Sequence, residues 1–213
     1  MGKTIKVNIS DRNPELISDV RSLIRGGGVV AFPTDTFYGL GVDPFNPAAI
    51  EKIYQIKGRD PKKPILILIE KKVRLNPLVK EVSKDAERLI KEFWPGPLTI
   101  IFKASSAIPA ILTGETGKVG IRLPASSFLL WLLEGLDSPL TATSANPSGL
   151  PSSATALEVE RYFNGKIDLI IDAGRTEGIR ESTIIDATKT PMTLVREGMI
   201  EKEWIESLIG RIK

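Results

Sequence analysis

PILILI, residues 64–69, is the stretch that decides the fold of this 213-residue chain. An uninterrupted apolar run of this length is typical of a strand that is buried on both faces of a sheet. The other segments that predict strands are VVAFP (29–33), LTIIFKA (98–104), VGIRLP (119–124), the start of PLTATSANPSG (139–149), IDLIIDAG (167–174), STIIDAT (182–188) and TLVREG (193–198).

Helices are predicted between these strands. Asn13-Pro14-Glu15 and Asn46-Pro47 each place a capping side chain before a proline at the first helical position, and Thr155 with Glu158 predicts a capping box. Apolar spacing predicts further helices at about 83–93, at 128–136 and close to the C-terminus. Segment 34–46, which glycine and proline interrupt, is expected to be a loop.

This interleaving predicts an α/β fold, in which a mixed parallel and antiparallel sheet is flanked by helices. The sequence contains no repeat, no low-complexity tract and no long linker. Residues 1–213 are therefore expected to form one domain.

The composition excludes several classes of chemistry. The chain has no cysteine and no histidine, so disulfides, thiol nucleophiles, imidazole bases and zinc sites built on these side chains are excluded. Its 29 Lys and Arg residues against 26 Asp and Glu, a net charge of +3, are too balanced to establish a nucleic-acid partner. No apolar run approaches the roughly 20 residues of a membrane span, and the N-terminus lacks a signal-peptide core, so a cytoplasmic protein without membrane contact is expected.

Positive charge gathers in KGRDPKKP (57–64), where Lys57, Arg59 and Lys63 lie at the entrance to the predicted strand. Two interpretations remain open. Cations at the C-terminal end of a helix stabilise it by about 0.3–1 kcal/mol, which requires no ligand. The two prolines stiffen this backbone, however, so an anion-binding site is the favoured interpretation.

Three further motifs carry polar groups beside predicted strands. PTDTFYGLG (33–41) places two threonine hydroxyls directly after a buried strand, as a ligand site or as a capped turn. KVGIRLP puts Lys118 and Arg122 on one face of a strand, a pattern that an ordinary half-exposed strand also shows. TATSANPSG offers Ser144 and Asn146 at a strand end, either as donors to a phosphate or as an Asn-Pro turn.

Taken in order, GGVVAFPTDTFYGLG, KGRDPKKP, KVGIRLP, TATSANPSG, ESTIID and LVREG resemble the motifs of the YrdC/TsaC family of threonylcarbamoyl-AMP synthases. The resemblance covers about residues 14–200. It implies a single YrdC-like domain with a twisted sheet and a large, positively charged concave cavity. It also implies a reaction in which L-threonine, bicarbonate and ATP give threonylcarbamoyl-adenylate and pyrophosphate. This is the first step of threonylcarbamoyladenosine formation in tRNA, and the product then passes to the tRNA threonylcarbamoyltransferase complex.

The resemblance also implies roles for individual residues. Those expected to hold threonine are Thr36, Arg122, the backbone of Ala142, and Ser182. Those expected to surround ATP are Arg59, Lys63, Lys118, Ser144, Asn146, Ser152 and Arg196. Lys57 and Arg59 are the expected catalytic residues, with Lys57 near the phosphates or the carbamate. Arg122 suits a carboxylate because a guanidinium can bind both of its oxygens. Mg²⁺ is expected to enter with ATP, without ligands from protein side chains.

The chain departs from the family pattern at three positions. Asp60 stands where the usual KxRP motif has proline, Leu68 stands where some two-domain relatives have histidine, and Lys118 stands where relatives often have threonine. None of these changes removes a residue that the implied chemistry requires.

Two alternatives belong to other functional classes. A non-catalytic module that binds tRNA or double-stranded RNA would interleave aromatic residues with cations, and only Tyr54 lies near the basic segments. The carbamoyl-transfer domain of hydrogenase-maturation proteins comes with cysteine-rich fingers, and this chain has no cysteine.

Overall fold

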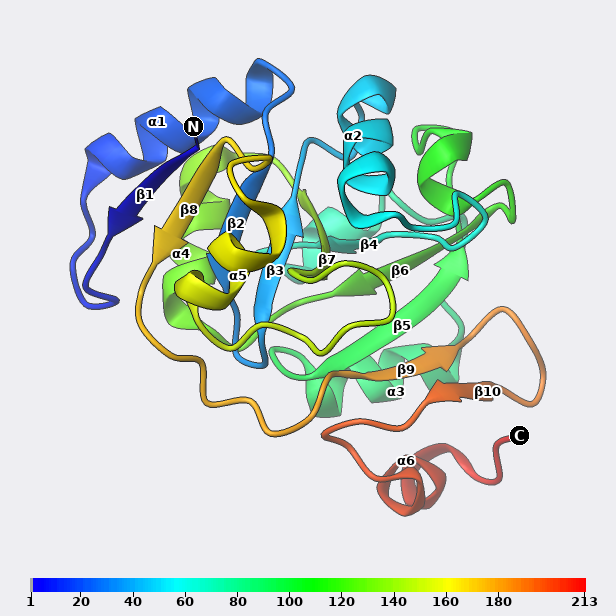
Figure 1. Ribbon diagram of the computed structural model, residues 1–213. Helices are drawn as coiled ribbons and strands as arrows, with labels where there is room; N and C mark the ends of the chain where they lie inside the picture. The colour runs from blue at the N-terminus through cyan, green and yellow to red at the C-terminus, as the bar shows by residue number, and fades with distance from the viewer. Residues whose placement is uncertain (1) are drawn as a thin grey trace.

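A mixed β-sheet forms the centre of the protein, whose computed structural model describes residues 2–213. Within these residues, ten strands join in the order β1-β8-β2-β3-β7-β4-β6-β5-β9-β10 (Figure 1). The strands are β1 (Lys3–Lys6), β2 (Val30–Pro33), β3 (Tyr38–Gly41), β4 (Leu66–Leu68), β5 (Leu98–Lys103), β6 (Lys118–Arg122), β7 (Leu140–Ser144), β8 (Leu169–Asp172), β9 (Thr183–Asp186) and β10 (Thr193–Arg196).

The helices interleave with these strands along the chain. They are α1 (Pro14–Arg25), α2 (Pro47–Lys57), α3 (Lys84–Phe93), α4 (Ser127–Leu136), α5 (Ala156–Phe163) and α6 (Lys202–Ile209), with 3₁₀ turns η1 (Lys72–Leu75) and η2 (Ala110–Thr113). β8 pairs in parallel with β1 and β2, whereas β3 and β7 are antiparallel to their neighbours. The predicted α/β class with a mixed, helix-flanked sheet is therefore confirmed.

The predicted helix starts are built as the sequence indicated. The side chain of Asn13 accepts a hydrogen bond from the Glu15 amide at the start of α1, and that of Asn46 accepts one from Ala49 in α2. The capping box of Thr155 and Glu158 is present at α5. These caps satisfy backbone donors that the first turn of a helix leaves without partners.

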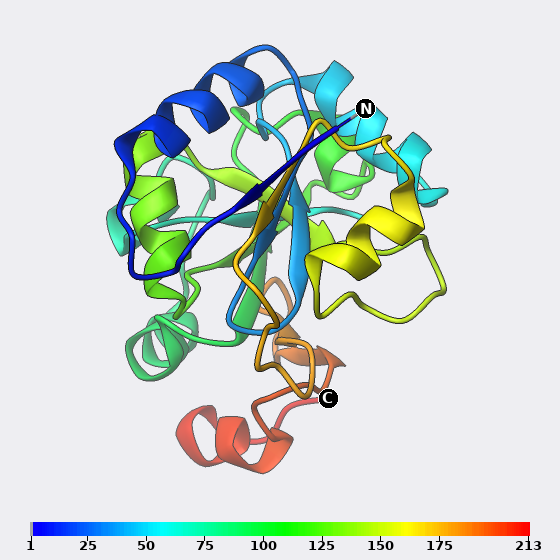
Figure 2. The same ribbon diagram turned by 60° about the vertical axis from the view of Figure 1, so that its left-hand side comes forward.

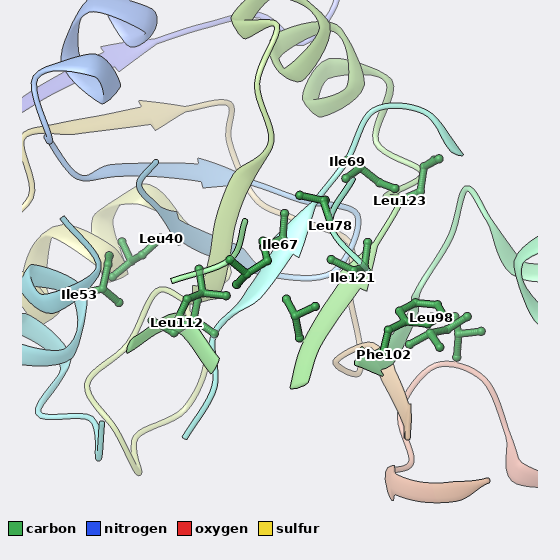
Figure 3. Close-up of a cluster of buried hydrophobic side chains, with 14 of the residues drawn as sticks. Leu40, Ile53, Ile67, Ile69, Leu78, Leu98, Phe102, Leu112, Ile121 and Leu123 are labelled. Carbon is green, nitrogen blue, oxygen red and sulfur yellow. The ribbon is translucent and has the colours of Figure 1, made fainter. Parts of the chain in front are cut away.

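The sheet is buried on both faces because its strands alternate apolar side chains between two cores. In β2, Ala31 packs in one core and Phe32 in the other, and in β4 Ile67 and Leu68 divide in the same way. Figure 2 shows α1 beside α4 on one side of the sheet, and α2 and α5 on the opposite side. Figure 3 shows the larger core, where Ile67 and Ile121 from paired strands lie close together.

The two helices α1 and α4 cover only part of their face. Their core contains residues of β2 and β8 together with Leu68 and Ala142, whereas the face formed by β6, β5 and β9 contributes nothing to that core. Residues on this second part of the face, including Gly120 and Ile184, line a cavity instead. The incomplete helical cover is therefore what leaves room for a site.

β3 is a difference from the sequence prediction, which expected a loop at 34–46. Its glycines permit close packing inside the sheet: a Cβ at Gly41 would lie 2.6 Å from the Thr141 carbonyl oxygen and 2.7 Å from the Phe32 ring. Glycine in this strand therefore allows neighbouring groups to approach the backbone and does not mark a loop. The sequence analysis also missed β1, a short edge strand with mostly exposed side chains.

No helix within residues 2–213 has both the length and the apolar composition needed to cross a membrane.

The central position of Ile67 gives a stability prediction. Its side chain is fully buried, and Ile67→Ala should lower the free energy of unfolding by about 2–5 kcal/mol because truncation leaves a cavity between paired strands. Urea denaturation measures this change. The exposed Val73 provides the control, since Val73→Ala should change stability by less than about 0.5 kcal/mol. Equal effects of the two substitutions would contradict the assignment of β4 to the core.

Candidate functional site

A cavity of about 310 Å³ opens on the part of the sheet that α1 and α4 leave uncovered. The predicted site residues that line it are Thr36, Arg59, Arg122, Ala142, Ser144, Ser152, Ser182 and Arg196. Those that the structure places outside the lining are Lys57, Lys63, Lys118 and Asn146. The cavity thus brings together all the residues expected to hold threonine and part of the set expected to surround ATP.

Strand alternation explains why residues from distant motifs meet in this cavity. Gly120 and Arg122 point to one face of β6, and Ala142 and Ser144 point to the same side from β7. Gly120 leaves space at the floor, because a Cβ there would meet side chains of neighbouring strands at 3.2–3.3 Å. The lining therefore combines small residues at these strand positions with larger polar and apolar side chains from other elements.

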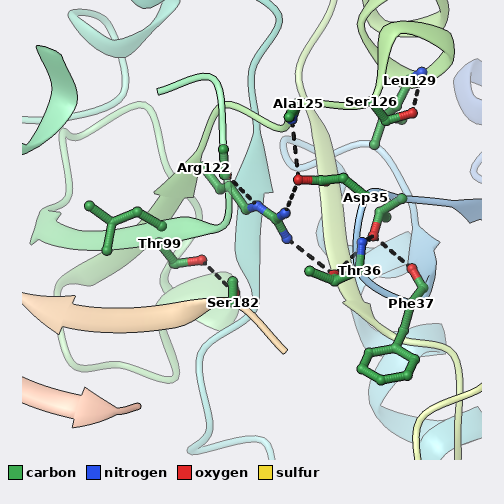
Figure 4. A network of polar contacts seen from close by, with 12 residues as sticks. Asp35, Thr36, Phe37, Thr99, Arg122, Ala125, Ser126, Leu129 and Ser182 are labelled. Atoms are coloured by element: carbon green, nitrogen blue, oxygen red, sulfur yellow. Dashed lines mark hydrogen bonds and ion pairs between the residues drawn. The ribbon is translucent and has the colours of Figure 1, made fainter. Parts of the chain in front are cut away.

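Arg122 is the most buried of the three arginines that line the cavity, and the protein holds its guanidinium on several sides (Figure 4). Nε donates to the carbonyl of Gly96 at 3.0 Å, Nη2 to Oδ2 of Asp35 at 2.6 Å, and Nη1 to Oγ1 of Thr36 at 3.4 Å. Burial lowers the pKa of Arg122, and the charge of Asp35 and its hydrogen bond act in the opposite direction. An ion pair this buried fixes the arginine in one position.

This geometry changes the expectation that Arg122 offers a free two-pronged fork to a carboxylate. Two of its three nitrogens already have protein acceptors at 3.0 Å or less, and Nη1 has only the long contact to Thr36. Nη1 is therefore the nitrogen with most capacity left for a ligand. The Asp35 carboxylate also accepts from the Ala125 amide at 3.3 Å, so it connects β6 to the loop that follows.

The hydroxyls beside Arg122 are paired with other hydroxyls. Oγ1 of Thr36 lies 3.0 Å from Oγ1 of Thr34, and Oγ of Ser182 lies 3.1 Å from Oγ1 of Thr99. In the Ser182–Thr99 pair either oxygen can be the donor, whereas the Thr34 hydroxyl already donates to the Phe37 carbonyl at 2.7 Å, so Thr36 is the donor to Thr34. The Ser182 hydroxyl can therefore donate to a ligand or accept from it by rotating a hydrogen, without moving the backbone.

Arg59 reaches the cavity from the proline-braced segment after α2. Its Nη2 donates to the Pro64 carbonyl at 2.9 Å and its Nε to the Lys63 carbonyl at 3.2 Å. Burial lowers the pKa of Arg59, with Tyr54 and Asp60 acting in the opposite direction. Asp60 itself accepts from the Lys62 amide at 2.9 Å, so it stabilises the turn that presents Arg59.

Lys57 does not line the cavity and lies behind its wall. Its ammonium donates to the carbonyl oxygens of Ser144 and of Asn146, the latter at 2.6 Å, and the Ser148 amide donates back to the Lys57 carbonyl at 2.9 Å. Burial lowers the pKa of Lys57 to about 7, the charge of Arg59 acts in the same direction, and the charge of Glu181 opposes both. In this structure Lys57 joins α2 to the segment that follows β7.

The remaining predicted cations and the amide have other contacts. Lys63 is exposed, and Lys118 forms an ion pair of 2.9 Å with Asp186 at the other end of β6 from Arg122. The side-chain amide of Asn146 donates to the Pro147 carbonyl at 3.1 Å and to the Leu150 carbonyl, which closes the loop after β7. Their predicted contacts with ATP stay predictions.

Sequence analysis did not identify Asp35 and Glu181 as members of the site. Glu181 lines the cavity, accepts a hydrogen bond of 2.7 Å from Oγ of Ser152, and forms an ion pair with Nη1 of Arg196. Asp35 directly precedes Thr36, and Glu181 directly precedes Ser182, both of which are predicted site residues. This adjacency was the sequence signal that could have identified the two acids. Their partners are distant in sequence, which pattern alone does not reveal.

The motifs and this geometry agree with a comparison against known protein families. The family model for Sua5, YciO and YrdC proteins, which carries the description "Telomere recombination", matches residues 22–198. The chain belongs to the Sua5/YciO/YrdC family.

Individual members of the Sua5/YciO/YrdC family match most of the chain. The threonylcarbamoyl-AMP synthase of Pyrococcus abyssi is 42% identical over 211 residues, which cover 99% of this chain and 62% of that protein. The threonylcarbamoyl-AMP synthase of Bacillus subtilis is 39% identical, covering 96% of this chain and 59% of that protein. The chain thus spans about three fifths of the length of these two relatives.

A solved structure from the family confirms the fold. The crystal structure of P. abyssi Sua5 complexed with L-threonine superposes with a TM-score of 0.94 at 41% identity, over 99% of this chain and 62% of that one. The resemblance to the YrdC/TsaC family and the expected α/β fold with a mixed, helix-flanked sheet are therefore confirmed.

Metal-binding side chains do not cluster in this site. Among the described residues, no group of three or more carboxylates could hold a metal ion. Of those that line the cavity, Glu181 is the one acidic residue, and its carboxylate is already bonded to Ser152 and Arg196.

The buried Lys57 predicts a particular dependence of stability on pH. Its pKa falls from an ordinary 10.5 to about 7 on folding, so between these values the unfolded chain binds more protons than the folded one. Stability should therefore rise as the pH increases above about 7, by up to about 1.4 kcal/mol per pH unit relative to Lys57→Met. Urea denaturation from about pH 6 to 9 measures the two slopes.

The exposed lysine of the same segment is the control for this experiment. Lys62→Met should keep the pH dependence of the wild-type protein, because its side chain is in solvent. Parallel curves for the wild type and Lys57→Met would show that Lys57 stays protonated throughout this range.

Proposed function

We propose that this protein is a threonylcarbamoyl-AMP synthase, which converts L-threonine, bicarbonate and ATP into threonylcarbamoyl-adenylate, pyrophosphate and water. The observation that carries the proposal is the buried Arg122, held by Asp35 in a cavity that Arg59 and Arg196 also line. Family membership and the names of the relatives support the same reaction.

Threonine is the ligand proposed for the deeper part of the cavity. Nη1 of Arg122 would receive its carboxylate, and the hydroxyls of Thr36 and Ser182 would bind its polar groups. A site built to hydrogen-bond a hydroxyl discriminates strongly against analogues that lack one. The relative P. abyssi Sua5 was solved in complex with L-threonine, which supports threonine as a ligand.

ATP is the ligand proposed for the outer part of the cavity. Arg59 and Arg196 would neutralise its phosphates, and the hydroxyls of Ser144 and Ser152 would donate to phosphate or ribose oxygens. Arg59 suits this role because its hydrogen-bond acceptors are carbonyl groups and not carboxylates, so no ion pair has to be broken for it to bind phosphate.

Mg²⁺ would enter as a complex with ATP. This ion usually binds through one or two carboxylates together with substrate phosphates. Because Glu181 is the one described acid in the lining and is already paired with Arg196, the residues fit an ion carried mainly by phosphate oxygens. When bound, Mg²⁺ would neutralise charge on the phosphates.

The chemistry follows from positioning two anions against each other. The threonine amine attacks the carbon of bicarbonate, water is lost, and a carbamate forms. A carbamate oxygen then attacks the α-phosphorus of ATP and pyrophosphate leaves. The protein contributes orientation through Arg122 and charge neutralisation through Arg59 and Arg196, which require no histidine or cysteine.

The labile product requires a further enzyme. Threonylcarbamoyl-adenylate is a mixed anhydride, so a transferase must pass its threonylcarbamoyl group to an adenosine of tRNA. We propose that the tRNA threonylcarbamoyltransferase complex is this transferase.

Threonine-dependent release of pyrophosphate tests the proposed reaction. The purified chain with ATP, Mg²⁺, bicarbonate and L-threonine should release pyrophosphate, and omission of threonine or bicarbonate should abolish the release. A coupled phosphate assay measures the rate, and chromatography identifies the adenylate. Pyrophosphate release at the same rate without threonine would refute the proposed function.

Arg59→Ala tests the role of the basic segment. Because Arg59 faces the cavity, its removal should lower kcat/KM for ATP by about 100-fold or more while the unfolding transition stays cooperative. Lys62→Ala, in the same turn but exposed, should stay within about twofold of the wild type. Comparable rates for Arg59→Ala and Lys62→Ala would mean that the basic segment is only the solvated end of a helix and does not contribute to ATP binding.

A further inference from the structure

Glu181 is an acid in a cavity proposed to bind a polyanion, and the proposed mechanism gives it no task. Its carboxylate accepts from Oγ of Ser152 at 2.7 Å and pairs with Nη1 of Arg196. These two residues are the donors proposed for ATP. The acid and the incoming nucleotide therefore compete for the same hydrogen-bond donors.

Arg196 is held in place independently of this acid. Its Nε and Nη2 donate to the carbonyl oxygen of Ser182 at 3.1 Å and 2.8 Å. Only Nη1 is directed at Glu181. Loss of the ion pair would therefore leave the guanidinium in position, with one nitrogen free for another anion.

Glu181 is arranged so that its side chain can leave while its backbone stays. Its carbonyl accepts from the Met199 amide at 3.0 Å, and a Cβ at Gly198 would lie only 2.1 Å from this oxygen, so the two backbones are tightly packed. By contrast, the side chains of Glu181 and Arg196 are each 37% exposed. Exposed pairs of this kind are weak and exchange readily with other ions.

Asp35, the acid that pairs with Arg122, is less free to move its side chain away. Asp35 is 16% exposed as a side chain, lies outside the cavity lining and pairs with an arginine that is 6% exposed. It therefore belongs to the scaffold. The charge of Glu181 also reaches the buried Lys57, where it opposes the effects of burial and of Arg59 on the pKa. The acid thus lies within electrostatic range of the cations on both walls.

We propose that Glu181 sets the affinity and selectivity of the cavity for the nucleotide: its carboxylate holds Ser152 and Arg196 in the empty site, and the phosphates of ATP displace it. This inference rests on the proposed function, because it takes ATP as the ligand. Arg59 is then the lining arginine that has no ion pair with an acid among the described residues, and the charge of Arg196 becomes fully available only to a ligand that displaces Glu181.

The test compares a charged and an uncharged ligand by calorimetry. Glu181→Gln keeps the size of the side chain and removes its charge, so it should tighten binding of metal-free ATP by about fivefold or more and leave adenosine unchanged. The effect should vanish in an Arg196→Met background, because the acid acts through that arginine. Glu177→Gln is the matched control: it makes the same charge change on an exposed residue of the same loop and should leave both affinities unchanged.

Several results would overturn the inference. Unchanged or weaker ATP binding by Glu181→Gln would mean that the acid does not compete with the phosphates. Tighter binding of both ATP and adenosine would mean that the substitution merely enlarges the cavity. An equal effect with and without Arg196 would exclude action through the ion pair. If the wild-type chain binds neither ligand, the proposed function fails and the inference fails with it. If the wild type binds ATP and Glu181→Gln binds it equally well, only the inference fails.

Discussion

The buried ion pair of Arg122 and Asp35 is the interaction on which the site depends. Arg122 sits at the end of a central strand, where burial of an unpaired guanidinium would be strongly unfavourable. Asp35, in the turn between β2 and β3, neutralises its charge. The carbonyl oxygen of Gly96 accepts a hydrogen bond from its Nε. Together these two contacts join three segments and fix the position of Arg122 in the cavity. The hydroxyls of Thr36 and Ser182 and the other two arginines of the lining lie around the same cavity.

Charge compensation differs between the inner and the outer part of the cavity. The Asp35 side chain is 16% exposed and pairs with the buried Arg122, whereas the Glu181 side chain is 37% exposed and is bonded to Ser152 and Arg196. Arg59 lies between these cases, since carbonyl oxygens satisfy its hydrogen bonds without cancelling its charge. Such a gradient is favourable for a cavity lined by three arginines, because cations that were all unpaired would repel one another and would attract any small anion.

The sequence predicted the fold well where apolar periodicity decides the structure. Strands such as β4 and β8 and the capped helices followed from local pattern, since burial and backbone hydrogen bonding leave few alternatives. β3 was missed because Gly39 and Gly41 read as loop residues until the packing of Phe32 against them is known. The motifs that contribute to the site were predicted from the sequence. The contacts that each side chain makes there were harder to predict. The position of Lys57 at a helix end fixes where its backbone lies, but the direction of its side chain depends on carbonyl groups 87 and 89 residues away.

The contacts of Lys57 affect which substitutions the cavity lining can accept during evolution. Its ammonium binds main-chain oxygens of Ser144 and Asn146, which every amino acid possesses, and ignores the side chains at those positions. The wall of the cavity is thus supported from behind by an interaction that is insensitive to residue identity. Substitutions in front can alter which ligand is recognised while the shape of the wall is retained. Main-chain atoms of this segment support the wall, and its side chains are available to recognise a ligand. The ligand can therefore change while the backbone of the wall stays the same.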